Sequence, residues 1–173
     1  MTNDRATIWQ DLVGAEFEHG GRGPKYDCLG IVLEVQRRVG YDVRDPVEAY
    51  RDGKAGHDFQ NAWCGSWKQT TEPKTFDAVL LKFNGRYHLG VIVDEYRILH
   101  AHHLKGVCVE RLDSFPRGSV IGCWTPSVER VPNANAPEYC PGDPFTGTEV
   151  VTLLGSEVFG GLSVFAAGAL SLA

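Results

Sequence analysis

The stretch Tyr26-Asp27-Cys28-Leu29-Gly30 decides the fold, because apolar residues at helical spacing follow it directly. These residues are Ile31, Val32, Val35 and Val39. Residues at such intervals lie on one face of an α-helix. Asp27 stands where an N-cap side chain accepts hydrogen bonds from the free N–H groups of the first turn, and Gly40 is a typical helix end. The sequence therefore predicts a helix over residues 28–38 that begins with a cysteine.

Cys28 is a candidate nucleophile because of this position. The partial positive charge of a helix N-terminus, the free N–H groups of the first turn and partial exposure lower the pKa of a thiol from its usual value near ~8.5. We therefore expect a lowered pKa and a reactive thiolate at Cys28. A cysteine is also among the most buried residue types, so the position alone does not establish chemistry.

Two hairpins follow in the sequence. Residues 78–83 and 87–93 alternate as strands do, and Asn84-Gly85 between them suits a type I′ turn. If residues 93–95 form the next loop, His88 pairs with His100 on the returning strand, and both imidazoles share one face. A loop one residue shorter would separate them. Further strands are expected over residues 107–112 and 120–124.

The remaining segments give weaker signals. A short amphipathic helix is expected over residues 6–15, and a glycine-rich loop over residues 17–24. Another helix is expected after Pro46. We expect the aromatic stretch that contains Trp63 to pack over the hydrophobic core.

Composition limits the class of protein. The chain has 173 residues, 43% hydrophobic and 23% charged, which suits one folded domain with a tail and excludes a disordered chain. The formal net charge of -5 and scattered Lys and Arg argue against a nucleic-acid partner. Five cysteines at irregular spacings do not form a secreted disulfide framework. The N-terminus lacks the pattern of a signal peptide.

Several motifs occur in a fixed order between residues 12 and 126. They are Gly20-Gly21, Tyr26-Asp27-Cys28-Leu29-Gly30, a strand over residues 76–83 that starts with Phe76-Asp77, His88-Leu89-Gly90-Val91, and His100-Ala101-His102. In these residues the chain resembles the NlpC family of cell-wall cysteine peptidases, a papain-like group, and most closely the type carried by tailed phages and gene transfer agents.

The resemblance implies an α+β, papain-like NlpC fold with N-terminal helices, in which the nucleophile helix packs on an antiparallel β-sheet, plus an extended C-terminal tail. It also implies that Cys28 is the nucleophile, that His88 is the general base and that His100 orients His88. Such a triad would hydrolyse an amide through a thioester.

Further candidate residues surround this triad. The resemblance implies oxyanion or substrate contacts from the loop before Cys28, where many family members have a tyrosine and this chain has Phe17 and then His19. Asp27, Tyr87 and Trp63 are the other candidates for oxyanion or substrate contacts.

A metal site is the alternative chemistry. His100-Ala101-His102 places two imidazoles on one strand face, and with His88 or a cysteine they could bind zinc. The chain lacks a Cys-x-x-Cys or His-Glu-x-x-His pattern, so we expect neither a metal nor another cofactor.

The C-terminal third has a different composition. Five of the nine prolines lie between Trp124 and Phe145, which indicates an extended linker. The expected domains are a peptidase domain over residues 1–127, a linker over 128–147 and an apolar docking segment over 148–173. Residues 158–173 carry no charge but are shorter than the ~20 residues of a membrane-spanning helix. We expect this segment to dock onto a phage tail hub or tip protein, with transient membrane contact as an alternative.

The expected function is therefore that of a peptidoglycan hydrolase at a phage tail tip. By resemblance it would cut the γ-D-glutamyl-diamino acid bond of stem peptides and aid passage through the cell wall. It would be made in the host cytoplasm and act from the virion in the periplasm or wall. One alternative is a structural tail-tip component with weak or no hydrolytic activity. Another is an amidase or acyltransferase of related fold.

Overall fold

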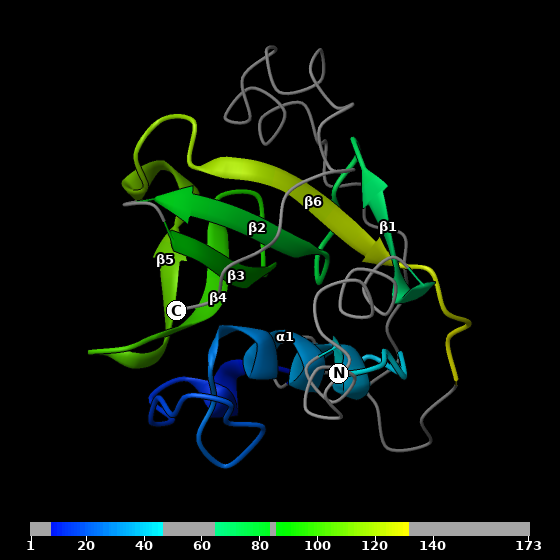
Figure 1. Cartoon of the computed structure of the whole chain (residues 1–173), viewed down its shortest axis with the longest axis horizontal. Helices are drawn as coiled ribbons and strands as arrows, with labels where there is room; N and C mark the ends of the chain where they lie inside the picture. Colours follow the sequence, from blue (N-terminus) through cyan, green and yellow to red (C-terminus); the bar gives the residue numbers. More distant parts are fainter. Residues whose placement is uncertain (1–7, 47–64, 84–85, 132–173) are drawn as a thin grey trace, which may run out of the picture.

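The computed structural model describes residues 8–46, 65–83 and 86–131. In Figure 1 helix α1 (Cys28–Arg38) lies along one side of a twisted sheet. The sheet has six strands in the order β1-β6-β2-β3-β4-β5, and every neighbouring pair is antiparallel. This confirms the predicted α+β fold. The elements are η2 (Gln10–Leu12), α1 (Cys28–Arg38), β1 (Trp67–Thr70), β2 (Ala78–Phe83), β3 (Arg86–Ile92), β4 (Arg97–His102), β5 (Gly106–Arg111), η3 (Leu112–Ser114) and β6 (Val120–Pro126).

Helix α1 begins at Cys28, as the sequence predicts. Asp27 caps it with a hydrogen bond from the backbone N–H of Gly30 to the carboxylate. The helix buries the face predicted from its apolar spacing and packs on strands β3 and β4. Gly40 follows with φ of +94°, a conformation that ends helices and that L side chains rarely adopt.

Two apolar clusters lie on opposite faces of the sheet, because successive strand residues point to opposite sides. The first cluster joins α1 to Val91 of β3 and to Leu99 and Ala101 of β4. The second includes Ile92 and Ile98 and lies on the other face. Buried side chains therefore cover both faces of the β3–β4 hairpin where its strands pair.

The register of that hairpin differs from the prediction. Val91 pairs with Leu99 and Ile92 with Ile98, so the loop covers residues 94–96 and not residues 93–95. The whole register is displaced by two residues. Since the loop still has an odd number of residues, the strand faces are unchanged, and His88 and His100 remain on one face as predicted.

Strand β2 pairs with β3 as predicted, from Ala78 with Val91 to Phe83 with Arg86. The latter pair leaves a two-residue connection at Asn84-Gly85, which lies outside the described residues. Strand β1 was not predicted. It pairs with β6 at the sheet edge and buries Trp67.

The extent of the first predicted helix is wrong. The helix expected over residues 6–15 is, in its described part, only the 3₁₀ turn η2. It stops because Gly14 has φ of +90° and its N–H donates to the carbonyl of Val107 in β5. Residues after 127 also contact the fold, since Val131 donates its N–H to the carbonyl of Gly40 and Arg130 donates to the carbonyl of Val39.

Some predictions lie outside the described residues. These are the helix after Pro46, the candidate residue Trp63, most of the linker and the apolar segment over residues 148–173. Within the part of the chain that the structure describes, no helix is long and apolar enough to span a membrane.

Candidate active site

Cys28 is the first residue of α1, and its side chain is partly buried. Backbone N–H groups of Leu89, Leu29 and Cys28 itself act to lower the pKa of the thiol. Burial acts more strongly in the opposite direction, with help from the Asp27 carboxylate, and the pKa of Cys28 is raised. The predicted lowering of the thiol pKa is therefore wrong. Cys28 rests as a neutral thiol, so it needs a base to become a nucleophile.

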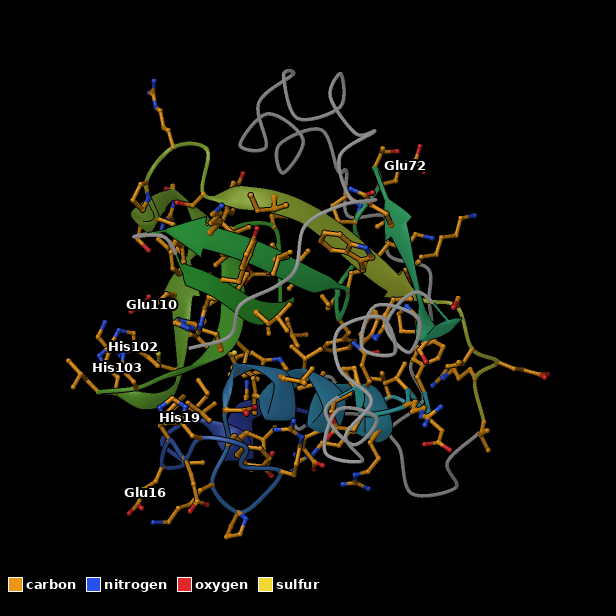
Figure 2. All side chains as sticks on the ribbon, viewed as in Figure 1. Glu16, His19, Glu72, His102, His103 and Glu110 are labelled. Carbon is orange, nitrogen blue, oxygen red and sulfur yellow. The ribbon has the colours of Figure 1, made fainter. Side chains whose placement is uncertain are left out.

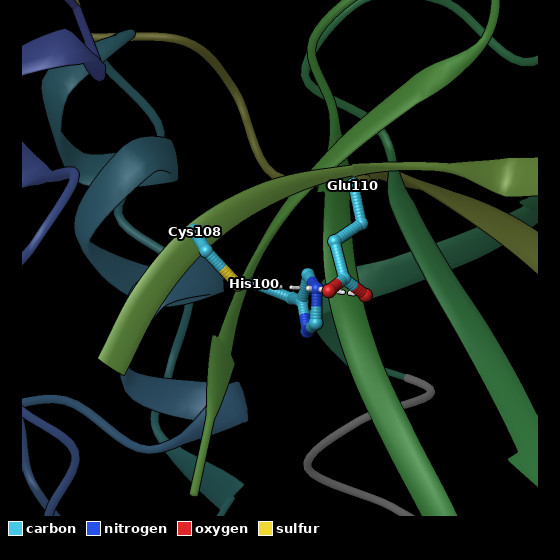
Figure 3. Close-up of side chains that lie close together, drawn as sticks. All are labelled: His100, Cys108 and Glu110. Carbon is cyan, nitrogen blue, oxygen red and sulfur yellow. Dashed lines mark hydrogen bonds and ion pairs between the residues drawn. The ribbon is translucent and has the colours of Figure 1, made fainter. Parts of the chain in front are cut away.

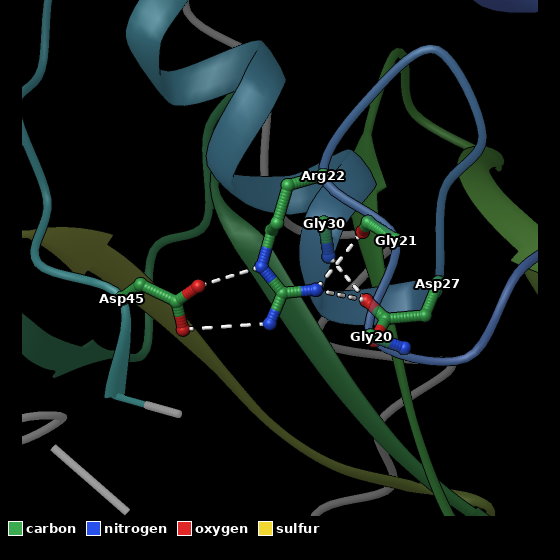
Figure 4. Close-up of polar contacts among 6 residues, drawn as sticks. All are labelled: Gly20, Gly21, Arg22, Asp27, Gly30 and Asp45. Atoms are coloured by element: carbon green, nitrogen blue, oxygen red, sulfur yellow. Dashed lines mark hydrogen bonds and ion pairs between the residues drawn. The ribbon is translucent and has the colours of Figure 1, made fainter. Parts of the chain in front are cut away.

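The carboxylate of Asp27 holds the loop before α1 in place (Figure 4). It accepts hydrogen bonds from the N–H of Gly30 at 2.6 Å, the N–H of Gly20 at 2.9 Å and a guanidinium nitrogen of Arg22 at 2.8 Å. Arg22 also contacts Asp45 at 2.6 Å through Nε, and so links the loop to the segment after the helix. With three donors on its oxygens, Asp27 is a positioning residue for the N-terminus of α1.

Gly30 is required by this packing. A Cβ atom at residue 30 would lie 2.0 Å from the carbonyl oxygen of Gly21, which also accepts a hydrogen bond from Arg22. No side chain fits at that distance. The glycine therefore lets the loop approach the first turn of the helix, next to Cys28.

His88 of β3 and His100 of β4 form a direct hydrogen bond of 2.7 Å between Nε2 of His88 and Nδ1 of His100. The rings meet edge to face, with centroids 4.9 Å apart. The observed register makes this a diagonal contact between the two strands. Gly90 lies between them in the sheet, and a Cβ there would be 3.4 Å from the Cβ of His100. The small residue keeps this position open for the two rings.

The residue after His88 contacts the candidate nucleophile. The backbone N–H that most strongly stabilises the Cys28 thiolate belongs to Leu89, the next residue of β3. Nε2 of His88 is engaged with His100, so proton exchange with a thiol would use Nδ1.

Glu110 of β5 fixes the direction of the hydrogen bonds. Its Oε2 lies 3.2 Å from Nε2 of His100, a histidine with only 1% of its side chain exposed. A lone pair on Nε2 would face the negative charge of the carboxylate, so Nε2 carries the proton of His100. Its Nδ1 is then unprotonated and accepts a hydrogen bond. Cys108 Sγ lies farther from the same nitrogen, at 3.6 Å, and is the weaker acceptor. His88 therefore donates its Nε2 proton to His100, which leaves its own Nδ1 free of a proton.

Both histidines are neutral at pH 7. Burial, together with the neighbouring His100, lowers the pKa of His88 to about 4. Burial also lowers the pKa of His100, although Glu110 opposes this. A neutral His88 with a bare Nδ1 is the protonation state required of a general base.

The other candidate residues fall into two groups. Phe17 bridges to Tyr26 two residues before Cys28, and its ring contacts His19 at 5.0 Å, so both loop candidates lie near the start of α1. Tyr87 points to the face of β3 opposite His88, because adjacent strand residues alternate, and Lys82 lies over its ring at 5.1 Å. The structure does not bring Tyr87 together with the histidines.

Figure 2 shows His19, His102 and His103 on the same side of the molecule as Glu110. His102 and His103 stack with ring centroids 4.6 Å apart at the end of β4. They form a histidine-rich rim beside the buried pair.

Sequence reasoning did not identify Arg22, Asp45 or Glu110. The alternation of β5 could have placed Glu110 on one face with Cys108, but its meeting with His100 depends on the β4–β5 register. That register pairs His100 with Cys108 and Ile98 with Glu110.

No protein-family model matches the sequence, and no curated protein matches it. Among solved structures, the fold is similar to that of the NlpC/p60 domain of the peptidoglycan hydrolase SagA, with a TM-score of 0.45 and 19% sequence identity. The match covers 66% of this chain and 93% of that chain. The similarity is too distant to assign this chain to a family or to an activity.

Proposed function

We propose that this chain is a cysteine hydrolase of amide bonds, with Cys28 as nucleophile, His88 as general base and His100 as the residue that orients the base. One observation carries the proposal: the hydrogen bond of 2.7 Å between His88 and His100. The residue after His88 in β3, Leu89, contacts the thiol of Cys28 through its backbone N–H. A cysteine at a helix start, together with a hydrogen-bonded histidine pair on the strand that it contacts, supplies the nucleophile, the base and the orienting group of a catalytic triad.

The chemistry begins from a neutral pair. His88 Nδ1 takes the proton of the Cys28 thiol as sulfur attacks the amide carbonyl, and His100 stabilises the imidazolium through its Nδ1. The imidazolium then gives the proton to the leaving amine, and a thioester remains on Cys28. Water attacks the thioester with His88 again as the base, which releases the acid and restores the thiol.

The oxyanion would be stabilised at the start of α1. Asp27 takes the N–H of Gly30, so the N–H groups of Cys28 and Leu29 are the donors of the first turn that remain beside the sulfur. Backbone donors at a helix N-terminus suit the negative charge that develops on the carbonyl oxygen.

The proposed substrate is the stem peptide of peptidoglycan, cut at the γ-D-glutamyl-diamino acid bond. The support is the resemblance of the motifs around Cys28, His88 and His100 to those of phage-type NlpC peptidases. On the same basis we propose that the protein acts from a virion tail tip, where residues 148–173 would attach it to a hub or tip protein.

The test is digestion of purified sacculi, with the released fragments identified by mass. We expect wild type to release stem-peptide fragments and Cys28→Ala to release none. Cys123→Ala is the matched control, because it alters a buried cysteine outside the proposed triad and should retain activity. Release that continues in Cys28→Ala would refute the assignment of the nucleophile.

A structural role without hydrolysis is the second candidate. It is favoured by Phe17, which has no hydroxyl at the loop position where the resemblance leads us to expect a tyrosine. Folded wild-type protein that releases nothing from sacculi of several peptide chemistries would support this candidate against the hydrolase. Restored release in Phe17→Tyr would locate the cause at this position.

A further inference from the structure

Three side chains with metal-binding atoms converge on one face of the β4–β5 hairpin (Figure 3). His100 comes from β4, and Cys108 and Glu110 come from β5. Their donor atoms all lie within 4.8 Å of one another. The register places Cys108 directly opposite His100, and Glu110 is opposite Ile98, two residues before His100. Paired strands therefore hold the three side chains in a preformed arrangement.

The distances suit tetrahedral coordination. Zinc bonds of about 2.0–2.3 Å place neighbouring donors roughly 3.3–3.6 Å apart. Nε2 of His100 lies 3.6 Å from Cys108 Sγ and 3.2 Å from Glu110 Oε2. The third pair, Cys108 Sγ and a Glu110 carboxylate oxygen, lies within 4.8 Å, so a bound ion would draw these two donors together around Nε2 of His100.

The charges and the exposure also favour a divalent ion. A Cys108 thiolate and the Glu110 carboxylate together balance the charge of Zn²⁺, and sulfur, imidazole and carboxylate are its usual ligands. Cys108 and Glu110 are partly exposed, which gives the ion access and leaves a fourth position to solvent. Lys105 opposes binding, but it is exposed and contacts only the other carboxylate oxygen, Oε1.

We propose that His100, Cys108 and Glu110 form a Zn²⁺ site and that bound Zn²⁺ switches the hydrolase off. The inhibition rests on the proposed function, whereas the binding of the ion does not. Zn²⁺ would occupy the lone pair of Nε2 on His100, so a neutral His100 must carry its proton on Nδ1. The hydrogen bond to His88 is then reversed.

The reversal removes the base. Nε2 of His88 now accepts the hydrogen bond from Nδ1 of His100, so a neutral His88 carries its own proton on Nδ1. That is the nitrogen that would otherwise take the proton of Cys28. The balance is simple: Cys108 releases one proton on binding sulfur to Zn²⁺, and the proton lost from Nε2 of His100 is matched by the one gained on Nδ1 of His88. No redox step is involved.

The binding test uses Co²⁺ as a spectroscopic probe, with the full chain in reduced form and with Cys28→Ala to remove the nucleophile thiol. We expect a thiolate-to-cobalt charge-transfer band that Zn²⁺ displaces and that is lost in Cys28→Ala/Cys108→Ser. Lys105→Gln should tighten binding several-fold, because a competing cation is removed. A band that persists in the double variant, or no band in Cys28→Ala, would overturn the site.

The inhibition test measures hydrolysis with and without Zn²⁺. With each protein compared to its own rate without zinc, Cys108→Ser should need at least about tenfold more Zn²⁺ for half-inhibition than wild type, and a chelator should restore wild type. Equal sensitivity of wild type and Cys108→Ser would place the inhibitory ion elsewhere and overturn the switch. If wild type has no hydrolase activity, the cobalt spectra still decide whether the site exists.

Discussion

His88 should make the stability of the fold depend on pH in a way that one substitution removes. Burial lowers the pKa of His88 from 6.5 to about 4 in the folded protein. The unfolded chain therefore binds a proton at pH 5, whereas the folded protein does not. The stability contributed by this histidine is complete above its unfolded pKa of 6.5 and is lost as the pH falls toward 4.

The size of the effect follows from the shift. Each pKa unit corresponds to about 1.4 kcal/mol, so the whole window is worth about 3 kcal/mol in the free energy of unfolding. Between pH 7.5 and pH 5 the expected loss is about 2 kcal/mol. His88→Gln should not show this loss. Its amide can still donate to Nδ1 of His100, so the substitution removes the titration and keeps a partner for the buried ring.

The assay is urea unfolding of wild type and His88→Gln at pH 7.5 and pH 5. We expect wild type to lose about 2 kcal/mol more than the variant between these two conditions. Asp77 changes stability in the opposite direction, but it is present in every protein compared, so its contribution cancels.

The reasoning would be refuted if wild type and His88→Gln lost the same free energy between the two pH values. An equal loss would mean that His88 titrates in the folded protein as it does in the unfolded chain. The imidazole would then be protonated well above pH 4 and would not be held as a buried neutral base.

Gly30→Ala should destabilise the fold by about 2–3 kcal/mol in urea unfolding, because its Cβ would lie 2.0 Å from the carbonyl oxygen of Gly21. Gly65→Ala is the control: its Cβ would have open space, so the free energy of unfolding should change little. Glu110→Gln should lower kcat on peptidoglycan fragments by about ten- to a hundredfold with little change in KM, since the charge that keeps the proton on Nε2 of His100 is removed; an unchanged kcat would contradict this role. Burial raises the pKa of Asp77 from 3.8 to about 6, so the free energy of unfolding of wild type falls as the pH rises through this range. Asp77→Asn lacks this titration. Its stability relative to wild type should therefore be about 2 kcal/mol greater at pH 8 than at pH 4. A constant difference across that range would show that the carboxyl of Asp77 is not held in its neutral form.

Much of the fold could be read from local patterns. The apolar spacing after Cys28 predicts α1, and the position of Asp27 predicts its cap, because both depend on residues close together in the chain. The alternation of residues 78–83 and 87–93 likewise predicts the first hairpin. Strand β1 has no such signal, since it is a short edge strand that is defined by its pairing with β6.

The contact between His88 and His100 could be predicted from the sequence only in part. The two histidines are twelve residues apart, and the loop between their strands has an odd number of residues, so both side chains lie on one face of the sheet. This part of the prediction is correct even though the predicted register is wrong by two residues. The exact partner did not follow, because a shift of two residues keeps every side chain on its face. Burial of Ile92 and Ile98 in one cluster and of Leu99 in the other is compatible with either register.

The sequence by itself determined which chemical groups this protein has and on which local elements they lie: a cysteine at a helix start and two histidines in phase on neighbouring strands. Only the tertiary structure decided their protonation and their direction of proton exchange. Burial outweighs the helix N-terminus at Cys28, and the β4–β5 register brings Glu110 to His100. Both effects depend on solvent exclusion and on charges from distant parts of the chain, which no local pattern records.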